Sequence, residues 1–266
     1  MLVVIKGAGD LATGVACRLF TCGFSVVMTE TARPTTVRCT VAFSQAVYRG
    51  EALVEGIPAR LAASPEEALF FTRRGFVAVL VDERARVVPT LRPDALADVI
   101  LAKRNLGTSI ADAPAVVAVG PGFTPGLDCH AAVETQRGHN LGRVLWDRPP
   151  APDTGVPGDI GGYTVERLLR APADGIFLPA SRIGDTVAAG QTVGFVGDHP
   201  MTARITGTLR GLLPEGTPVT TGMKSGDIDP RCRPEHCFSV SDKARAVGGG
   251  VLEAILHRYA VLQNIR

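Results

Sequence analysis

The feature that most limits how this chain can fold is a glycine loop set between an apolar run and a helical pattern. Leu2–Lys6 read as a short β-strand, and a G-x-G-x-x-A sequence follows at once and leads into Leu11–Phe20. This order is typical of a nucleotide-binding βαβ unit, in which the loop lets phosphate approach the backbone and the helix N-terminus. The sequence therefore predicts a nucleotide site that includes Gly7, Gly9, Asp10, Leu11 and Ala12.

An acidic residue and an arginine lie at and beyond the end of the next predicted strand. Glu30 ends Ser25–Glu30, 21 residues after Gly9, where a carboxylate can accept hydrogen bonds from a ribose diol. Asp10 would repel phosphate unless a cation faces it, and Arg38 could supply a planar cationic fork. The alternatives are an ordinary glycine turn and a solvated surface arginine.

The first half of the chain alternates strand and helix patterns, which predicts a Rossmann-like parallel sheet. Val77–Asp82 and Val116–Val119 read as strands, whereas Pro93–Arg104 and Asp128–Thr135 read as helices. Residues 52–60 read as two strand fragments joined at Gly56, and Ser64 reads as the cap of a following helix. A second glycine loop follows Val116–Val119, and loops at the carboxyl ends of strands in an open α/β sheet share one crevice. We expect this loop to bind the same ligand through Gly120, Pro121, Gly122 and Phe123, or else to be an ordinary rigid turn.

The second half has a different character and follows a proline-rich stretch at 147–153 that cannot sustain a helix or a central strand. Beyond it, Gly175, Gly184, Val187, Gly190 and Gly194 recur 32 positions later. This repeat of glycine turns and short β segments predicts two interlocked β-layers, and it resembles the biotinyl/lipoyl barrel-sandwich fold. Carrier domains of that fold present a modifiable lysine between the repeats. None stands there, so we expect a structural or binding module.

A helical pattern closes the chain, with a serine or aspartate as its cap. Its three glycines, Gly248–Gly250, would each weaken an exposed helix by about 1 kcal/mol, a cost that close approach to another backbone or a ligand would justify. The expected organisation is a Rossmann-like nucleotide-binding domain over residues 1–148, a mostly-β barrel-sandwich module over 149–235, and a C-terminal helix over 236–266 that packs back on the first domain.

Charge and composition argue against several partners. The chain has 28 basic and 26 acidic side chains spread along it, which favours neither nucleic acid nor an anionic membrane. It shows no secretory leader and no run of about 18 apolar residues, so we expect a cytoplasmic protein. There the six cysteines would stay thiols. Cys232, His236 and Cys237 have poor spacing for zinc, and no metal site is predicted.

Seven segments spread over nearly the whole chain carry a family resemblance: residues 6–14, 28–30, 34–38, 41–44, 120–123, 226–231 and 241–250. They look like the YqeB family, which is associated with selenium-dependent molybdenum hydroxylases. The resemblance implies a maturation factor that binds a nucleotide or molybdopterin dinucleotide and has a molybdenum hydroxylase apoenzyme as its partner. One departure is Cys39, which stands where the family commonly has a second arginine.

Two other functions remain open at this point. An NAD(P)-dependent oxidoreductase would use the same glycine loops, but no Lys-Tyr or His-Asp acid–base arrangement stands out. A non-catalytic scaffold would use the β-module as a surface for a partner. No catalytic residue is identified, and homo-oligomerisation is left open.

Overall fold

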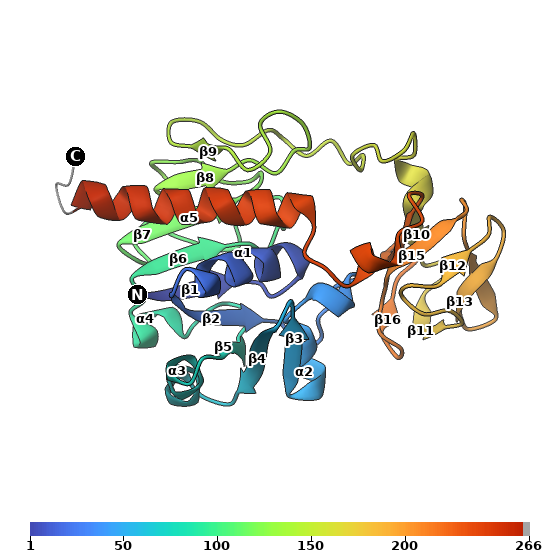
Figure 1. Cartoon of the computed structure of the whole chain (residues 1–266), viewed down its shortest axis with the longest axis horizontal. Coiled ribbons are helices and arrows are strands. Elements are labelled where there is room, and N and C mark those ends of the chain that lie inside the picture. Colours follow the sequence, from blue (N-terminus) through green and yellow to red (C-terminus); the bar gives the residue numbers. More distant parts are fainter. Residues whose placement is uncertain (263–266) are drawn as a thin grey trace. The chain divides into compact units, whose positions relative to one another are not determined.

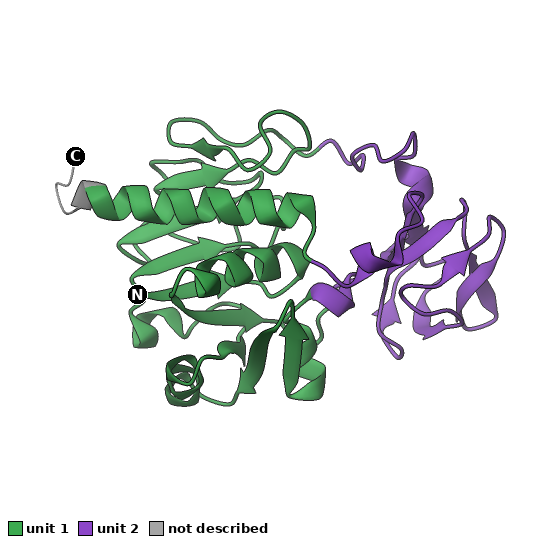
Figure 2. Cartoon of the chain, viewed as in Figure 1, with its two compact units in different colours: residues 1–34, 42–153, 240–266 green, residues 35–41, 154–239 purple. Residues whose placement is uncertain are grey.

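The computed structural model describes residues 1–262, which form two compact units (Figures 1 and 2). Unit 1 comprises Met1–Pro34, Ala42–Asp153 and the segment from Val240 onward. Unit 2 comprises Thr154–Ser239 together with the short segment Thr35–Val41. Unit 1 is therefore assembled from three stretches of chain, and unit 2 from two.

A nine-stranded sheet forms the centre of unit 1, in the order β3-β4-β5-β2-β1-β6-β7-β8-β9. Its strands are β1 (Leu2–Lys6), β2 (Ser25–Glu30), β3 (Glu51–Val54), β4 (Ile57–Ala62), β5 (Val77–Val81), β6 (Ala95–Asp98), β7 (Ala115–Val119), β8 (Ala131–Val133) and β9 (Val144–Leu145). The pairs from β4 to β8 are parallel, whereas β3 on β4 and β9 on β8 are antiparallel. The expected parallel Rossmann-like sheet is thus corrected to a mixed sheet with antiparallel strands at both edges.

Both faces of this sheet are covered. Val4 packs in one core cluster with residues of α3 and α4, whereas its neighbours Val3 and Ile5 point to the opposite face, because side chains alternate along a strand. The helices are α1 (Asp10–Thr21), α2 (Gln45–Arg49), α3 (Pro65–Arg73), α4 (Val88–Leu91) and α5 (Asp242–Leu262). α5 lies beside α1 (Figure 1), so closely that a Cβ built on Gly14 would stand 2.6 Å from the Cβ of Ala244.

Two expected helices are wrong. Pro93–Arg104 contains the strand β6, and Asp128–Thr135 contains the strand β8. Both strands are short, fully buried and rich in alanine, so their composition does not distinguish a strand from a buried helix. Pairing with neighbours that are remote in sequence decides their structure: β6 lies between β1 and β7.

Other local predictions are confirmed. The hairpin expected around Gly56 is the antiparallel pair β3–β4, with positive φ at Glu55 and Gly56. Ser64 caps α3 by accepting a hydrogen bond from the N–H of Glu67, and Ser241 Oγ accepts one from Ala244 ahead of α5. These features depend on neighbouring residues alone, which is why the sequence predicts them well.

Unit 2 consists of two four-stranded antiparallel sheets, in the orders β10-β17-β15-β12 and β14-β13-β11-β16. The strands are β10 (Leu168–Arg170), β11 (Gly175–Pro179), β12 (Thr186–Val187), β13 (Thr192–Val196), β14 (His199–Thr202), β15 (Gly207–Leu212), β16 (Pro218–Val219) and β17 (Lys224–Asp229). The 32-residue repeat is visible here, since β11, β12 and β13 correspond to β15, β16 and β17. Each copy gives its short middle strand to the sheet of the other, which confirms the interlocked layers.

The barrel-sandwich assignment itself is wrong. Strand pairing stops at the edges of two separate four-stranded sheets, and β10 and β14, which correspond to one another at the same 32-residue offset, each lie at one edge of a sheet. Short 3-10 turns complete unit 2: η1 (Cys39–Val41), η2 (Val165–Arg167) and η3 (Pro234–Cys237). Within residues 1–262, no helix combines the length and apolar character that a membrane crossing requires.

Candidate functional site

The paired strands β15 and β17 of unit 2 have one apolar and one polar face. Leu209 lies opposite Ile228, and both are buried in the core of the unit. Thr208 lies opposite Asp229, and directly opposed residues of antiparallel strands point to the same side of the sheet. Thr208 and Asp229 are both fully buried, so this side carries polar groups out of contact with solvent.

A β-bulge places Arg210 on the polar face. The register advances by two residues on β15, from Leu209 to Gly211, while it advances by one on β17, from Ile228 to Asp227. Arg210 is the extra residue, and a bulge of this kind re-aims the side chain that it carries. Its guanidinium is buried at 6% exposure, and Nη1 lies 3.9 Å from Asp229 Oδ2.

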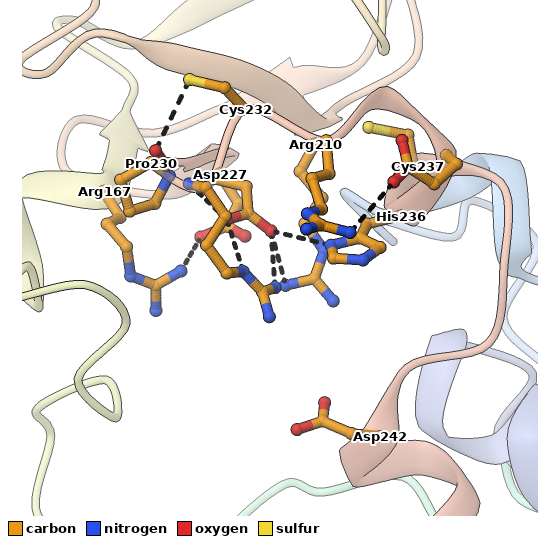
Figure 3. A network of polar contacts seen from close by, with 12 residues as sticks. Arg167, Arg210, Asp227, Pro230, Cys232, His236, Cys237 and Asp242 are labelled. Atoms are coloured by element: carbon orange, nitrogen blue, oxygen red, sulfur yellow. Dashed lines mark hydrogen bonds and ion pairs between the residues drawn. The ribbon is translucent and has the colours of Figure 1, made fainter.

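Three cationic or titratable groups converge on the same oxygen of Asp229. Arg231 donates from Nη2 to Oδ2 at 2.6 Å and from Nε to Oδ1 at 2.9 Å. His236 Nδ1 and Arg210 Nη1 each lie 3.9 Å from Oδ2. Figure 3 shows the side chains of Arg210 and His236 directed into this network. We call Thr208, Arg210, Asp229, Arg231 and His236 the Arg210 site.

The charges of the site determine how Asp229 ionises. Burial raises the pKa of this carboxyl, but the hydrogen bonds from Arg231 and the charges of Arg231 and Arg210 outweigh burial, so the pKa lies below its ordinary value of 3.8. Asp229 is therefore an anion at neutral pH, and it accepts hydrogen bonds from Arg231. Arg210 interacts with this carboxylate only at 3.9 Å, which is too long for a hydrogen bond.

Three buried polar atoms of the site have no hydrogen-bond partner among the described residues: Nε of Arg210, Oγ1 of Thr208 and Nδ1 of His236. A guanidinium has five N–H donors, and burial without acceptors is costly for so strongly polar a group. The site thus has unused donor capacity around one buried positive charge.

Two further arginines of unit 2 donate hydrogen bonds from their terminal nitrogens, although the Nε of Arg167 is also buried without a hydrogen-bond partner among the described residues. Arg167 donates to Asp227 Oδ1 at 3.1 Å and to the carbonyl oxygen of Gly158 at 3.3 Å. Arg38 donates to the carbonyl oxygens of His236 and Ser239 at 2.9 and 3.2 Å. Arg38 was expected in a nucleotide site with the glycine loops, but it belongs to unit 2, whereas those loops belong to unit 1.

The site reaches solvent on one side. The side chain of Arg231 is 41% exposed and that of His236 is 32% exposed, whereas Arg210 and Asp229 behind them are buried. A small molecule approaching from this side meets Arg231 and His236 first.

The internal repeat contains a signal that could have found the site from sequence. Subtracting 32 from Thr208, Arg210 and Asp227 gives Ile176, Leu178 and Phe195. In the first copy these three residues are apolar and exposed, whereas in the second they are polar and buried. The fold therefore accepts apolar residues at these positions, and the polar set is peculiar to the second copy.

The first predicted glycine loop has its own intramolecular partners. Glu30 Oε2 accepts a hydrogen bond from the N–H of Ala8 at 2.9 Å, and Oε1 accepts one from Thr31 at 2.8 Å. Gly7 has φ +94°, and a Cβ there would stand 3.1 Å from the carbonyl oxygen of Val99. Glu30 and Gly7 thus have structural roles without any ligand. Gly9 precedes α1, Asp10 and Leu11 lie in its first turn, and Ala12 is buried beneath it.

The second predicted loop packs on the same segment of chain as the first. A Cβ on Gly122 would stand 2.5 Å from the Cα of Arg104, and one on Gly120 would stand 3.1 Å from the Leu101 side chain. Pro121 lies between these glycines, and Phe123 is buried in the core of unit 1. Residues 99–104 therefore pack against both glycine loops.

Lys6, Asp98 and Thr108 form a buried polar cluster in unit 1 that was not predicted from the sequence. Lys6 Nζ donates to Thr108 Oγ1 at 2.5 Å, Thr108 Oγ1 donates to Asp98 Oδ2 at 2.5 Å, and Lys6 and Asp98 form an ion pair at 3.4 Å. Lys6 ends β1 and Asp98 ends β6, so the cluster fixes the loop that carries Thr108 to the carboxyl edge of the sheet. No group of three or more histidine, cysteine or acidic residues within residues 1–262 could hold a metal ion.

Sequence comparison gives one close relative. No family model matches the chain. The chain is 52% identical over 255 residues to a protein of Escherichia coli strain K12 named "Uncharacterized protein YqeB". The match covers 96% of this chain and 47% of that protein, so the chain spans about half the length of the curated relative. This similarity supports the family resemblance seen in the sequence, although the name mentions neither selenium nor molybdenum.

Structure comparison gives only distant neighbours. One is described as a succinylglutamate desuccinylase/aspartoacylase from Rhodobacter sphaeroides, with 15% identity, 85% of this chain and 84% of that chain covered, and a TM-score of 0.28. Another is described as an aspartoacylase family protein from Mesorhizobium loti, with 14% identity, coverages of 87% and 86%, and a TM-score of 0.31. Scores this low carry neither the fold nor the activity of those proteins over to this chain.

The functions expected from the sequence are corrected at this point. These neighbours are described as aspartoacylase-type proteins, not as a molybdenum hydroxylase maturation factor or an NAD(P)-dependent oxidoreductase. Within unit 1, the carboxylate of Glu30 accepts a hydrogen bond from the first glycine loop, and residues 99–104 pack against both glycine loops.

Proposed function

We propose that unit 2 binds a small anionic metabolite, through a carboxylate or phosphate group that docks on Arg210. The observation that carries this proposal is the buried guanidinium of Arg210, whose Nε has no hydrogen-bond partner among the described residues and whose nearest carboxylate oxygen is 3.9 Å away. Ionised groups in protein interiors are normally paired and hydrogen-bonded, because desolvation of an unpaired charge is costly. A bound anion would supply the missing acceptors.

The chemistry of the site supports an oxygen anion as the ligand. A guanidinium presents parallel N–H donors that match the two oxygens of a carboxylate or phosphate. Asp229 cannot serve Arg210 in this way, because its two oxygens accept hydrogen bonds from Arg231. Arg231 and His236 at the exposed side would meet an incoming anion and steer it inward.

The repeat supports a binding role over a structural one. Leu178 occupies the position of Arg210 in the first copy and pairs there in regular register with Phe195, so both the arginine and the bulge that carries it are peculiar to the second copy. A buried ion pair is weak evidence for stabilisation, since apolar residues of similar volume often stabilise a fold more. An arginine retained in a bulge, with unused donors, fits a ligand contact better than a packing role.

Calorimetric titration of the whole protein with sodium phosphate and with sodium acetate tests this proposal. We expect saturable binding of at least one of these anions to the wild type, and a loss of about tenfold or more in affinity for Arg210→Met, the size of a hydrogen bond to a charged group. Arg182→Met removes an exposed arginine of the same unit and should leave affinity unchanged.

A second readout separates lost binding from lost folding. Because Arg210→Met removes a buried charge with unused donors, the variant without ligand should melt at the same temperature as the wild type or higher. The increase in Tm that phosphate or acetate gives to the wild type should disappear. Absence of binding to the wild type, or binding that survives in a folded Arg210→Met, would overturn the proposal.

A further inference from the structure

We infer that Thr208 is the second contact of the anion that docks on Arg210, and that it makes the site selective for oxyanions over halides. This inference rests on the proposed function. It begins from position: Thr208 lies directly opposite Asp229 on the paired strand, and Arg210 follows two residues later on β15. Both residues therefore adjoin the same carboxylate, on the same face of the sheet.

The hydroxyl of Thr208 is unusual among the buried threonines of the chain. Thr208 has no exposed surface, and its Oγ1 has no hydrogen-bond partner among the described residues. By contrast, Thr13 donates to the carbonyl oxygen of Ala8, and Thr217 donates to that of Pro214 at 2.6 Å. A buried hydroxyl without a partner destabilises a protein, and a bound oxyanion that accepts from it would remove this cost.

The fold does not need that hydroxyl. Ile176 stands 32 residues earlier, at the corresponding position of the first copy. Isoleucine and threonine are both β-branched, so a residue with the same branching but no hydroxyl suits this strand position. Ile176 is exposed whereas Thr208 is fully buried, so the two copies differ at this position in both polarity and burial.

The pair of contacts defines the chemical class of the ligand. A carboxylate or phosphate has at least two oxygens, so one can accept from the guanidinium of Arg210 while another accepts from the hydroxyl of Thr208. A halide offers a single atom and cannot present two separate acceptors. The site should therefore bind phosphate or acetate in preference to chloride, and Thr208 should account for part of that preference.

Titration of the wild type, Thr208→Val and Thr208→Ser with sodium phosphate, sodium acetate and sodium chloride tests this inference. We expect Thr208→Val to weaken binding of the preferred oxyanion about tenfold, the effect of one hydrogen bond to an ionised group. Chloride binding should not change. Thr208→Ser keeps the hydroxyl and should stay within about threefold of the wild type.

The outcomes separate the two proposals. If Thr208→Val binds each anion as the wild type does while Arg210→Met loses binding, this inference is wrong and the proposed function stands. If the wild type binds none of the three anions, the proposed function itself fails. Without ligand, Thr208→Val should melt no lower than the wild type, because it removes a hydroxyl that has no partner; a lower Tm would show a structural hydroxyl and overturn the inference.

Discussion

Glu30 Oε2 accepts a hydrogen bond from the backbone N–H of Ala8 at 2.9 Å, so the first glycine loop is held by a carboxylate of the protein itself. Ala8 is fully buried. We expect Glu30→Ala to leave this amide without its acceptor and to lower the free energy of unfolding by about 1–3 kcal/mol. Urea denaturation measures the change. The exposed Glu51→Ala serves as a control and should stay within about 0.5 kcal/mol of the wild type; an unchanged midpoint for Glu30→Ala would contradict the prediction.

Adjacent glycines of α5 should respond in opposite directions to the same substitution. A Cβ on Gly250 would collide with the carbonyl oxygen of Gly142 and stand 2.9 Å from the Val133 side chain, whereas nothing lies within 4 Å of one on Gly249. Gly250→Ala should therefore destabilise unit 1 by about 1–3 kcal/mol. Gly249→Ala should stabilise it by about 0.5–1 kcal/mol through helix propensity. Thermal melts of the two variants provide the comparison, and equal shifts would refute the close packing.

The Lys6–Asp98 pair should behave as a coupled unit. Their side chains are 4% and 2% exposed, so Lys6→Met leaves an uncompensated charge in the interior and should cost about 3–5 kcal/mol. The double variant Lys6→Met/Asp98→Asn should cost less than the sum of the two single variants, because it removes both charges. Chemical denaturation of the four proteins gives the coupling energy. Additive effects would mean that the two residues act independently.

Buried cysteines should react more slowly with alkylating reagents than exposed cysteines do. Burial raises the pKa of the Cys17 and Cys129 thiols to about 12, and it also raises that of Cys237. Because the thiolate is the reactive form, these three should resist alkylation in the native protein at pH 8. Cys22 and Cys232 are exposed and should react quickly. Iodoacetamide labelling followed by peptide mass spectrometry, with a urea-unfolded control, locates each modification; rapid native labelling of Cys237 would contradict this division.

Asp229 should contribute to stability only above the acid range. Its pKa is lower in the folded protein than its ordinary value of 3.8, so the native state holds the carboxylate more strongly than the unfolded chain does. That contribution is complete above the unfolded pKa and is lost as pH falls through the folded one. The difference in unfolding free energy between the wild type and Asp229→Asn should therefore shrink toward low pH. Urea titrations at several pH values test this. A free-energy difference between the two proteins that grows as pH falls would contradict the prediction.

Local signals predicted much of unit 1. The strand, glycine loop and helix at residues 2–21, the hairpin at Gly56 and the serine cap of α3 all depend on residues close in sequence. β6 and β8 were mistaken for helices, because only their pairing with remote strands makes them strands. The contacts of Gly7 and Gly122 with residues 99–104 are equally remote in sequence, so the glycine pattern alone could not predict this packing.

The Arg210 site could not be predicted by motif. Its residues come from β15, β17 and η3, and they meet only through strand register and a bulge. Arg210 has no distinctive neighbours in sequence. The one usable signal was the 32-residue repeat, where polar residues replace Ile176, Leu178 and Phe195. The shared glycines reveal the repeat, whereas the residues that differ between its copies mark the site.

The pairing of α5 with α1 also sets an order of events during synthesis. α1 ends at Thr21 and α5 begins at Asp242, with all of unit 2 encoded between them. At about 5–20 residues per second, a ribosome needs roughly 10–45 s to cover that interval. Until then the sheet face that α5 covers stays open in the nascent chain, so unit 2 can complete its fold before unit 1. This interval is when chaperone binding would compete most directly with aggregation.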